Sequence, residues 1–121
     1  MSSQRLAPGL VEGFKLCLRD SVGYRSVSYV EESPMYYRIG EWARPRGLNG
    51  PLAVFDQFNH MTWLVRSFGL ASWKYVGFKV EYLPSSIRAL WVPGRFVKEW
   101  ETPSGTRFAE RVKLVEVVRE F

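Results

Sequence analysis

The sequence predicts an α+β domain in which one mainly antiparallel, twisted sheet packs against a single main helix, at about residues 57–68. Four apolar residues recur there at the spacing of one helical face: Met61, Leu64, Val65 and Phe68. Directly afterwards, residues 76–82 alternate between apolar and polar side chains, which is the period of a half-buried strand. Most other apolar segments are short and end at turn residues, which favours strands.

The two ends of the helix are also predicted. Asp56 follows an apolar run, and its carboxylate can accept hydrogen bonds from the first helical turn, so we expect Asp56 to be the N-cap. Gly69 follows Phe68, at a position where a left-handed residue commonly ends a helix. Because the helix and the next strand adjoin in the chain, we expect Leu64 and Phe68 to be buried against the apolar face of residues 76–82.

The rest of the chain is expected to form strands. Alternation and β-branched residues place them at 14–19, 25–31, 35–42, 52–55, 87–92, 95–100 and 111–118. The first two would form a hairpin, and Gly40 would make a bulge in the third. The last segment also fits a helical face, so strand and helix both stay open there. The two strands that flank the helix can run parallel through a right-handed crossover.

Length and composition indicate a single globular domain. The 121 residues suffice for one core, and a hydrophobic content of 46% argues against wholesale disorder. Residues 1–12 are expected to form a loosely ordered tail before one domain at 13–121. No apolar run approaches the roughly 20 residues that span a bilayer, and the N-terminus lacks the apolar stretch of a signal peptide. We therefore expect an intracellular protein without membrane contact.

One cysteine and one histidine limit the chemistry. Cys17 alone cannot form an intramolecular disulfide or a thiolate zinc site, and we expect a small buried hydrophobic residue rather than a reactive thiol. His60 lies off the apolar helix face, where a half-exposed surface residue is the simpler interpretation and a general base the alternative. The chain has no Gly-rich phosphate loop. We therefore expect no catalytic residues, no metal and no cofactor.

The composition favours an anionic partner. The net charge is +5, and twelve of the seventeen basic residues are Arg, which binds planar anions and stacks on rings better than Lys does. Aromatic residues make up 16% of the chain and include five Trp, which is more than one core needs. We expect the surplus arginines and rings to line a groove or an interface.

The first candidate for a nucleic-acid interface surrounds a Pro- and Gly-rich loop at residues 43–51. Arg38 and Trp42 precede the loop, and Arg44 and Arg46 lie in it without a neighbouring acid. Guanidinium groups would bind phosphates there, and the indole would stack on a base. The alternative is a solvated loop whose arginines keep the protein soluble.

The second candidate is a basic sheet face with interleaved aromatic residues. Its cations are Lys74, Lys79, Arg88 and Arg95. Sheets that bind single-stranded RNA combine stacking rings with cations that hold phosphates. Glu81 shares a strand face with Lys79, so the alternative is cross-strand pairing of charges on a wet face.

Glu99-Trp100-Glu101 resembles the Glu-x-Glu motif of arginine-directed ADP-ribosyltransferases. That family also places an Arg on an early strand, where Arg38 would fit, and a Ser-x-Ser strand between the two motifs. Here Ser26-Val27-Ser28 precedes Arg38, so the order differs from that of the family. The alternative is two exposed carboxylates that flank a buried Trp100.

The succession YRIGEW, a Pro/Gly loop, GPLAVFD, a helix, FKVEY and PSGTRFAERVKLVEVV resembles small uncharacterised proteins of viruses, phages and other mobile elements, over about residues 35–118. The resemblance implies an α+β domain in a viral setting, hence the host cytoplasm, and no activity. The predicted function is a small non-enzymatic basic protein that contacts nucleic acid or a host macromolecule through Arg and aromatic side chains. The alternatives are a self-associating structural protein, expected as a dimer, and an ADP-ribosyltransferase-like enzyme.

Overall fold

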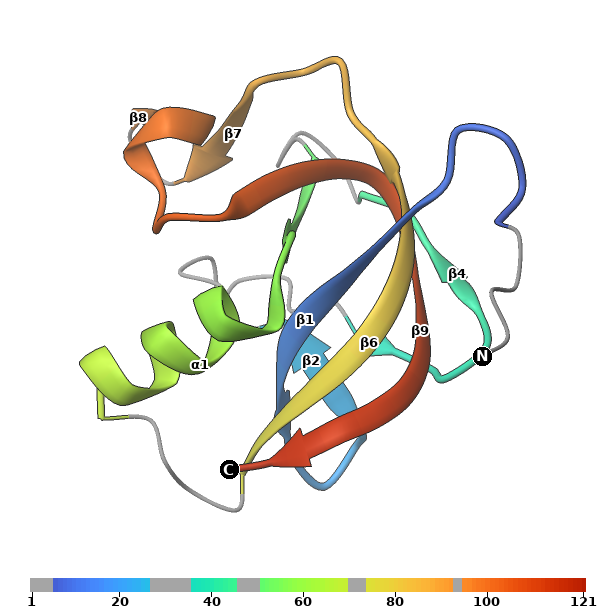
Figure 1. Ribbon diagram of the computed structural model, residues 1–121, viewed down its shortest axis with the longest axis vertical. Helices are drawn as coiled ribbons and strands as arrows, with labels where there is room; N and C mark the ends of the chain where they lie inside the picture. Colours follow the sequence, from blue (N-terminus) through green and yellow to red (C-terminus); the bar gives the residue numbers. More distant parts are fainter. Residues whose placement is uncertain (1–5, 27–35, 46–50, 70–73, 93–94) are drawn as a thin grey trace.

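The computed structural model describes residues 6–26, 36–45, 51–69, 74–92 and 95–121, and only the backbone of 90–92 and 95–96. These residues form a mainly antiparallel sheet and one α-helix, which confirms the predicted α+β class (Figure 1). In chain order the elements are β1 (Val11–Arg19), β2 (Tyr24–Ser26), β3 (Tyr36–Tyr37), β4 (Trp42–Ala43), β5 (Leu52–Phe55), α1 (Phe58–Ser67), β6 (Tyr75–Pro84), β7 (Ala89–Val92), β8 (Arg95–Lys98), the 3₁₀ turn η1 (Glu99–Glu101) and β9 (Thr106–Glu120). Within the described ranges, no helix is long and apolar enough to cross a bilayer.

Four strands close the sheet into a small barrel. β6 pairs with β1 and β9, and β5 pairs with the same two strands, so the order β1–β6–β9–β5 returns to β1. The long β9 makes closure possible because it pairs with β5 near its start and with β6 along the rest of its length. The closing contact is narrow, with Phe14 of β1 opposite Phe55 of β5. β2 and β3 extend the sheet from β1, β4 adds to β9, and β7 and β8 form a separate hairpin.

The strands on either side of α1 run in the same direction, which the sequence allowed. In the described part of the chain they do not pair with each other, because β9 lies between them and pairs antiparallel with each. On the other side of the barrel β1 lies between them, and the connection through α1 passes over β1.

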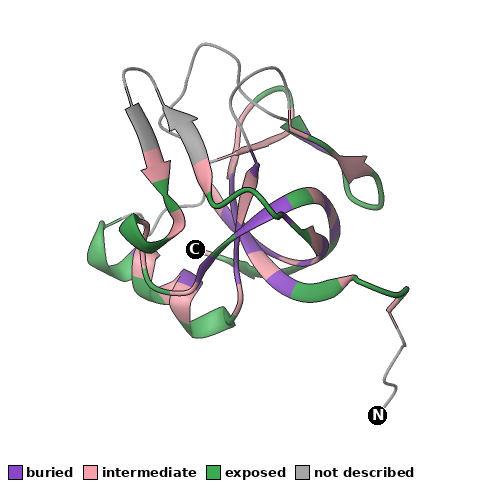
Figure 2. Ribbon diagram, turned by 90° about the horizontal axis from the view of Figure 1, so that it is seen from above, coloured by how far each residue is buried: buried purple, intermediate pink, exposed green. Residues whose placement is uncertain are grey.

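Closure gives the molecule two apolar clusters, one inside the barrel and one beneath α1. The outer cluster joins Met61 and Val65 of the helix to Leu16 and Phe55 of the barrel. Figure 2 shows the buried residues concentrated where the strands meet. The inner cluster holds ten buried residues: Cys17, Tyr37, Val54, Val76, Phe78, Val80, Tyr82, Ala109, Val112 and Leu114.

The expected packing of α1 is therefore partly wrong. Leu64 is half-buried against the outer cluster, but Phe68 is 60% exposed. The apolar face of β6 points into the barrel and not toward the helix, as Phe78 of the inner cluster shows. α1 lies over β1 and over Gly77, whose missing side chain leaves room for Met61. The C-terminal end of α1 projects beyond the strands (Figure 1), which leaves Phe68 in solvent.

The start of α1 also differs from the prediction. Gln57 and not Asp56 is the N-cap, and its side chain forms no capping hydrogen bond. Asp56 instead continues the pairing of β5 with β9, because its N–H donates to the Gly105 carbonyl at 2.9 Å. Its carboxylate binds Arg107, with an N–O distance of 2.9 Å. The predicted left-handed residue after the helix is confirmed, since Gly69 has a φ of 63°.

Several strand boundaries differ from the predicted ones. β1 begins at Val11, inside the segment expected to be a loose tail. The strand predicted at 35–42 is two short strands, β3 and β4, because Gly40 has a φ of 86° and lies in a turn rather than a bulge. Most of the strand predicted at 25–31 lies outside the described residues. The C-terminal segment is a strand, β9, and not a helix.

Candidate nucleic-acid interface

Basic side chains gather around Trp42 where β4 pairs with β9. The Arg111 guanidinium lies 4.5 Å from the centre of the indole ring, and the Lys113 ammonium lies 5.1 Å from it. Both distances suit cation–π attraction. The strand register causes this contact, because Trp42 lies opposite Lys113. Trp42 is half-buried, and its ring contacts both cations. The ring therefore holds the two cations in place and is not an open stacking surface.

Two of the predicted arginines flank β4 in the chain. Arg38 is in the turn before the strand, Arg44 follows the strand directly, and both are exposed. The turn is attached to β9, because the Gly40 N–H donates to the Leu114 carbonyl at 2.8 Å. The fourth predicted residue of this group, Arg46, lies outside the described residues. We call the following residues the Trp42 surface: Arg38, Trp42, Arg44, Arg111 and Lys113.

The cations of the Trp42 surface are only partly neutralised. Lys113 forms an ion pair with Glu81 at 3.3 Å. Over the described ranges, the three arginines of the surface form no ion pair with a carboxylate. Two exposed acidic residues, Glu41 and Glu110, adjoin the surface in sequence and moderate its field. An anion can therefore reach the arginines without displacing an internal partner.

The second predicted group is not brought together. Lys74 precedes β6 and Arg88 follows it, so the ten residues of that strand separate them. Lys79 lies between them and forms an ion pair with Glu12 of the neighbouring strand at 3.5 Å. This contact agrees with the alternative of cross-strand charge pairing. Arg95 is the first residue of β8, where only the backbone is described.

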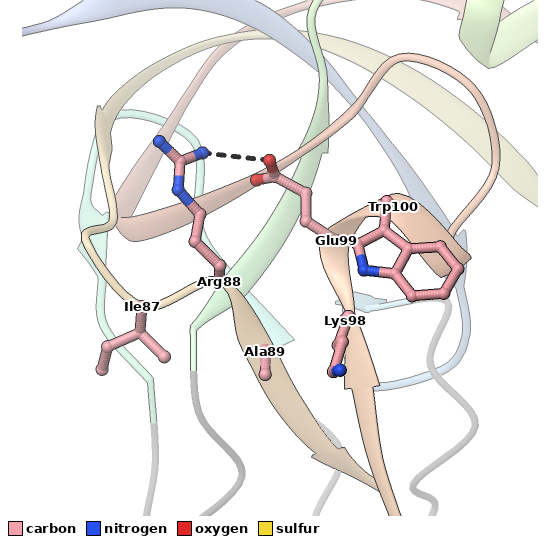
Figure 3. A pocket seen from close by; sticks show the side chains of 6 residues that line it. All are labelled: Ile87, Arg88, Ala89, Lys98, Glu99 and Trp100. Carbon is pink, nitrogen blue, oxygen red and sulfur yellow. Dashed lines mark hydrogen bonds and ion pairs between the residues drawn. The ribbon is translucent and has the colours of Figure 1, made fainter.

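Arg88 instead lies at a pocket beside the β7–β8 hairpin (Figure 3). The pocket is open to solvent, has a volume of about 440 Å³ and is lined by six residues, which we call the hairpin pocket: Ile87, Arg88, Ala89, Lys98, Glu99 and Trp100. The Arg88 guanidinium binds the Glu99 carboxylate at 3.0 Å, and the Lys98 ammonium lies 5.9 Å from the centre of the Trp100 ring. Trp100 is 78% exposed, so the expectation that it is buried between two carboxylates is wrong.

Backbone hydrogen bonds fix the base of the hairpin pocket to β9. The Ser85 N–H donates to the Phe108 carbonyl at 3.0 Å, and the Phe108 N–H donates to the Glu99 carboxylate at 3.0 Å. Phe108 thus fixes the chain before β7, at Ser85, and after β8, at Glu99. The Glu101 carboxylate accepts a hydrogen bond from the Lys98 N–H at 2.9 Å. Both carboxylates of the Glu-x-Glu motif therefore stabilise the turn that exposes the indole, which favours a structural role for them.

The remaining candidate groups do not form an accessible site with either surface. Cys17 is buried in the barrel, and burial raises the pKa of its thiol to about 12 against the opposing effect of Lys15, so the thiol is inert, as expected. Burial lowers the pKa of Lys15, whose ammonium group donates to the Ala53 carbonyl at 2.7 Å and links β1 to β5. His60 is half-exposed on α1, as predicted, and its Nε2 lies 3.8 Å from Asp56 Oδ1.

Three basic residues near these surfaces were not predicted as site residues: Arg111, Lys113 and Lys98. The strand predicted at 111–118 already places Arg111 and Lys113 on one face. What the local pattern could not show is that Trp42 shares this face, because that follows only from the pairing of β4 with β9.

No family model, curated protein or solved structure matches this chain. The functional assignment therefore rests on the residues themselves.

Proposed function

We propose that this protein is a small, non-enzymatic, basic binding protein that holds nucleic acid by its phosphate groups at the Trp42 surface. One observation supports the proposal most. The Trp42 ring holds Arg111 and Lys113 side by side, while the exposed Arg44 follows the same short strand directly and the exposed Arg38 begins the turn that leads into it. Contacts to phosphates position a protein without reading the bases, so we expect binding with little sequence preference.

The fixed positions of these cations favour binding. A flexible basic side chain loses conformational freedom when it binds, and that loss reduces affinity. The indole already restricts Arg111 and Lys113, so they lose less freedom than free surface side chains do. The net charge of +5 adds long-range attraction to a polyanion. The viral setting and the host-cytoplasmic location stay predictions from the sequence pattern.

The test is a binding titration with a fluorescently labelled oligonucleotide at low salt. The double variant Arg44→Gln, Arg111→Gln removes two charges from the Trp42 surface. If each phosphate contact contributes about 0.5–1 kcal/mol, affinity falls by about 1–2 kcal/mol, or roughly 5- to 30-fold. Arg44→Gln alone isolates the exposed residue, because Arg111 also packs on Trp42 and can affect the fold.

Arg66→Gln is the matched control. Arg66 is exposed in the last turn of α1, and Figure 1 shows α1 and β4 on different sides of the barrel. The control loses one charge from the protein but none from the Trp42 surface, so its affinity should stay near that of the wild type. Equal losses for Arg44→Gln and Arg66→Gln, or unchanged binding by a folded double variant, would contradict the assignment of this surface.

A second candidate function is self-association as a structural protein, and β9 supports it. Val115, Val117 and Val118 are exposed near the end of this strand, although each is apolar. Within the described part of the chain, residues 115–120 pair with β6 alone, which leaves their second edge open. An open edge with apolar side chains can pair with the same edge of a second copy.

A further inference from the structure

The hairpin pocket presents a large aromatic ring to solvent from a hydrogen-bonded turn. Trp100 is 78% exposed and Ile87 is 58% exposed. The hairpin pairs Ala89 with Lys98, and Ile87 and Trp100, two residues before and two residues after that pair, both line the pocket. Figure 3 shows Ala89 and Lys98 between them in this view. The side chains thus form a row that is apolar at both ends and has an ammonium group in the middle.

The turn that carries Trp100 is held from several directions. The Glu99 carboxylate accepts the Phe108 N–H, and the Glu101 carboxylate accepts the Lys98 N–H. The Thr102 hydroxyl donates to the Glu99 carbonyl. A binding site held by such supporting contacts loses little entropy when a ligand docks. The backbone that carries the exposed indole is therefore fixed before a ligand docks.

The charges around the ring suit an anion that carries a planar group. Lys98 places its ammonium 5.9 Å from the indole centre. Arg88 keeps 71% of its side chain exposed while Glu99 orients its guanidinium from one end. Glu99 also accepts a hydrogen bond from Phe108 of β9, so the carboxylate that orients Arg88 is itself held in place. The guanidinium has further N–H groups that can donate to a ligand. A flat ring on the indole with a phosphate near Lys98 or Arg88 matches this arrangement.

We propose that the hairpin pocket binds an unpaired nucleobase of single-stranded nucleic acid, with the base stacked on Trp100 and adjacent phosphates held separately by Lys98 and by Arg88. The inference rests on the proposed function, because it takes the ligand to be nucleic acid. It adds a preference for single strands, since bases in a duplex are stacked on each other and cannot reach the indole. The volume of about 440 Å³ lies within the range of about 300–1,000 Å³ that small-ligand pockets occupy.

The experiment compares a labelled single-stranded oligonucleotide with a blunt duplex of the same sequence. Trp100→Ala should weaken binding of the single strand about 5- to 150-fold, the equivalent of about 1–3 kcal/mol per stacked base. Its affinity for the duplex should stay that of the wild type. Trp100→Phe keeps a ring and should recover part of the lost affinity. Trp63→Ala is the matched control, because Trp63 is 52% exposed but lies on α1 and does not line the pocket.

The outcomes separate this inference from the proposed function. If a folded Trp100→Ala variant binds the single strand like the wild type, the pocket inference is wrong, while the effect of Arg44→Gln can still support the Trp42 surface. The inference is also wrong if Trp100→Ala weakens both probes equally, or if Trp63→Ala has the same effect. If the wild type binds neither probe at low salt, the proposed function itself is contradicted.

Discussion

The buried thiol of Cys17 should make the stability of the fold depend on pH in the alkaline range. Burial raises the pKa of this thiol from 9.0 to about 12. In the unfolded chain the thiol loses its proton near its ordinary pKa, whereas the native protein keeps the proton. Above the ordinary pKa of the thiol, unfolding therefore releases a proton, and the free energy of unfolding falls as pH rises.

The size of this effect follows from the shift. At about pH 10.5, roughly 1.5 units above the ordinary pKa of 9.0, the native state loses about 2 kcal/mol relative to the unfolded state. The full loss, reached near the raised pKa, is about 4 kcal/mol. Cys17→Ala removes the titrating group. Lys15 and Tyr37 remain in both proteins, and burial rather than Cys17 is the largest cause of both their pKa shifts, so most of their titration cancels when the two pH dependences are compared.

Urea denaturation with a reducing agent measures the effect at about pH 8 and about pH 10.5, on either side of the point where the unfolded thiol titrates. Between the two conditions, the wild type should lose about 2 kcal/mol more free energy of unfolding than Cys17→Ala does. The absolute stability of the variant is not the measure, because a small cavity also lowers it. Equal losses for the two proteins would show that the thiol is not held protonated inside the barrel, and would contradict the burial of Cys17 in the inner cluster.

Two further predictions concern closure and assembly. A side chain at Gly13 would place its Cβ 2.7 Å from the Phe55 carbonyl oxygen, so Gly13→Ala must separate β1 from β5 where the barrel closes and should cost about 1–3 kcal/mol in urea denaturation. Unchanged stability would contradict the closed barrel. For assembly, we expect a dimer through the open edge of β9. Light scattering should give a dimer mass at high micromolar concentration, and Val117→Lys should return it to a monomer, whereas a monomeric wild type would remove the second candidate function.

The sequence was most informative where local periodicity determines an element. The spacing of Met61 and Val65 predicts α1, and the alternation at 76–82 predicts β6. Periodicity shows that β6 has an apolar face but not which layer covers that face. The barrel closes through the contact of Phe14 with Phe55, which are far apart in the chain, and closure turns Phe78 inward and away from the helix.

The candidate site was likewise predictable only where its residues lie close together in the sequence. Arg38 and Arg44 lie close to Trp42 in sequence, and the structure exposes them on either side of β4, Arg38 in the preceding turn and Arg44 directly after the strand. Arg111 joins them only because β4 pairs with β9. The exposure of Trp100 was not predictable, because the segment that contains it alternates like a strand. It turns instead where the flanking glutamates accept backbone hydrogen bonds.

The salt dependence of binding tests the nucleic-acid proposal most directly. The logarithm of the binding constant for a single strand falls with the logarithm of salt concentration by about 0.7 for each phosphate contact, so three or four contacts at the Trp42 surface predict a slope of about −2 to −3. Removing two of those contacts with Arg44→Gln, Arg111→Gln should flatten the slope by about 1.4 units, while Arg66→Gln leaves it unchanged. A slope near zero for the wild type, or equal slopes for the wild type and the double variant, would contradict the account.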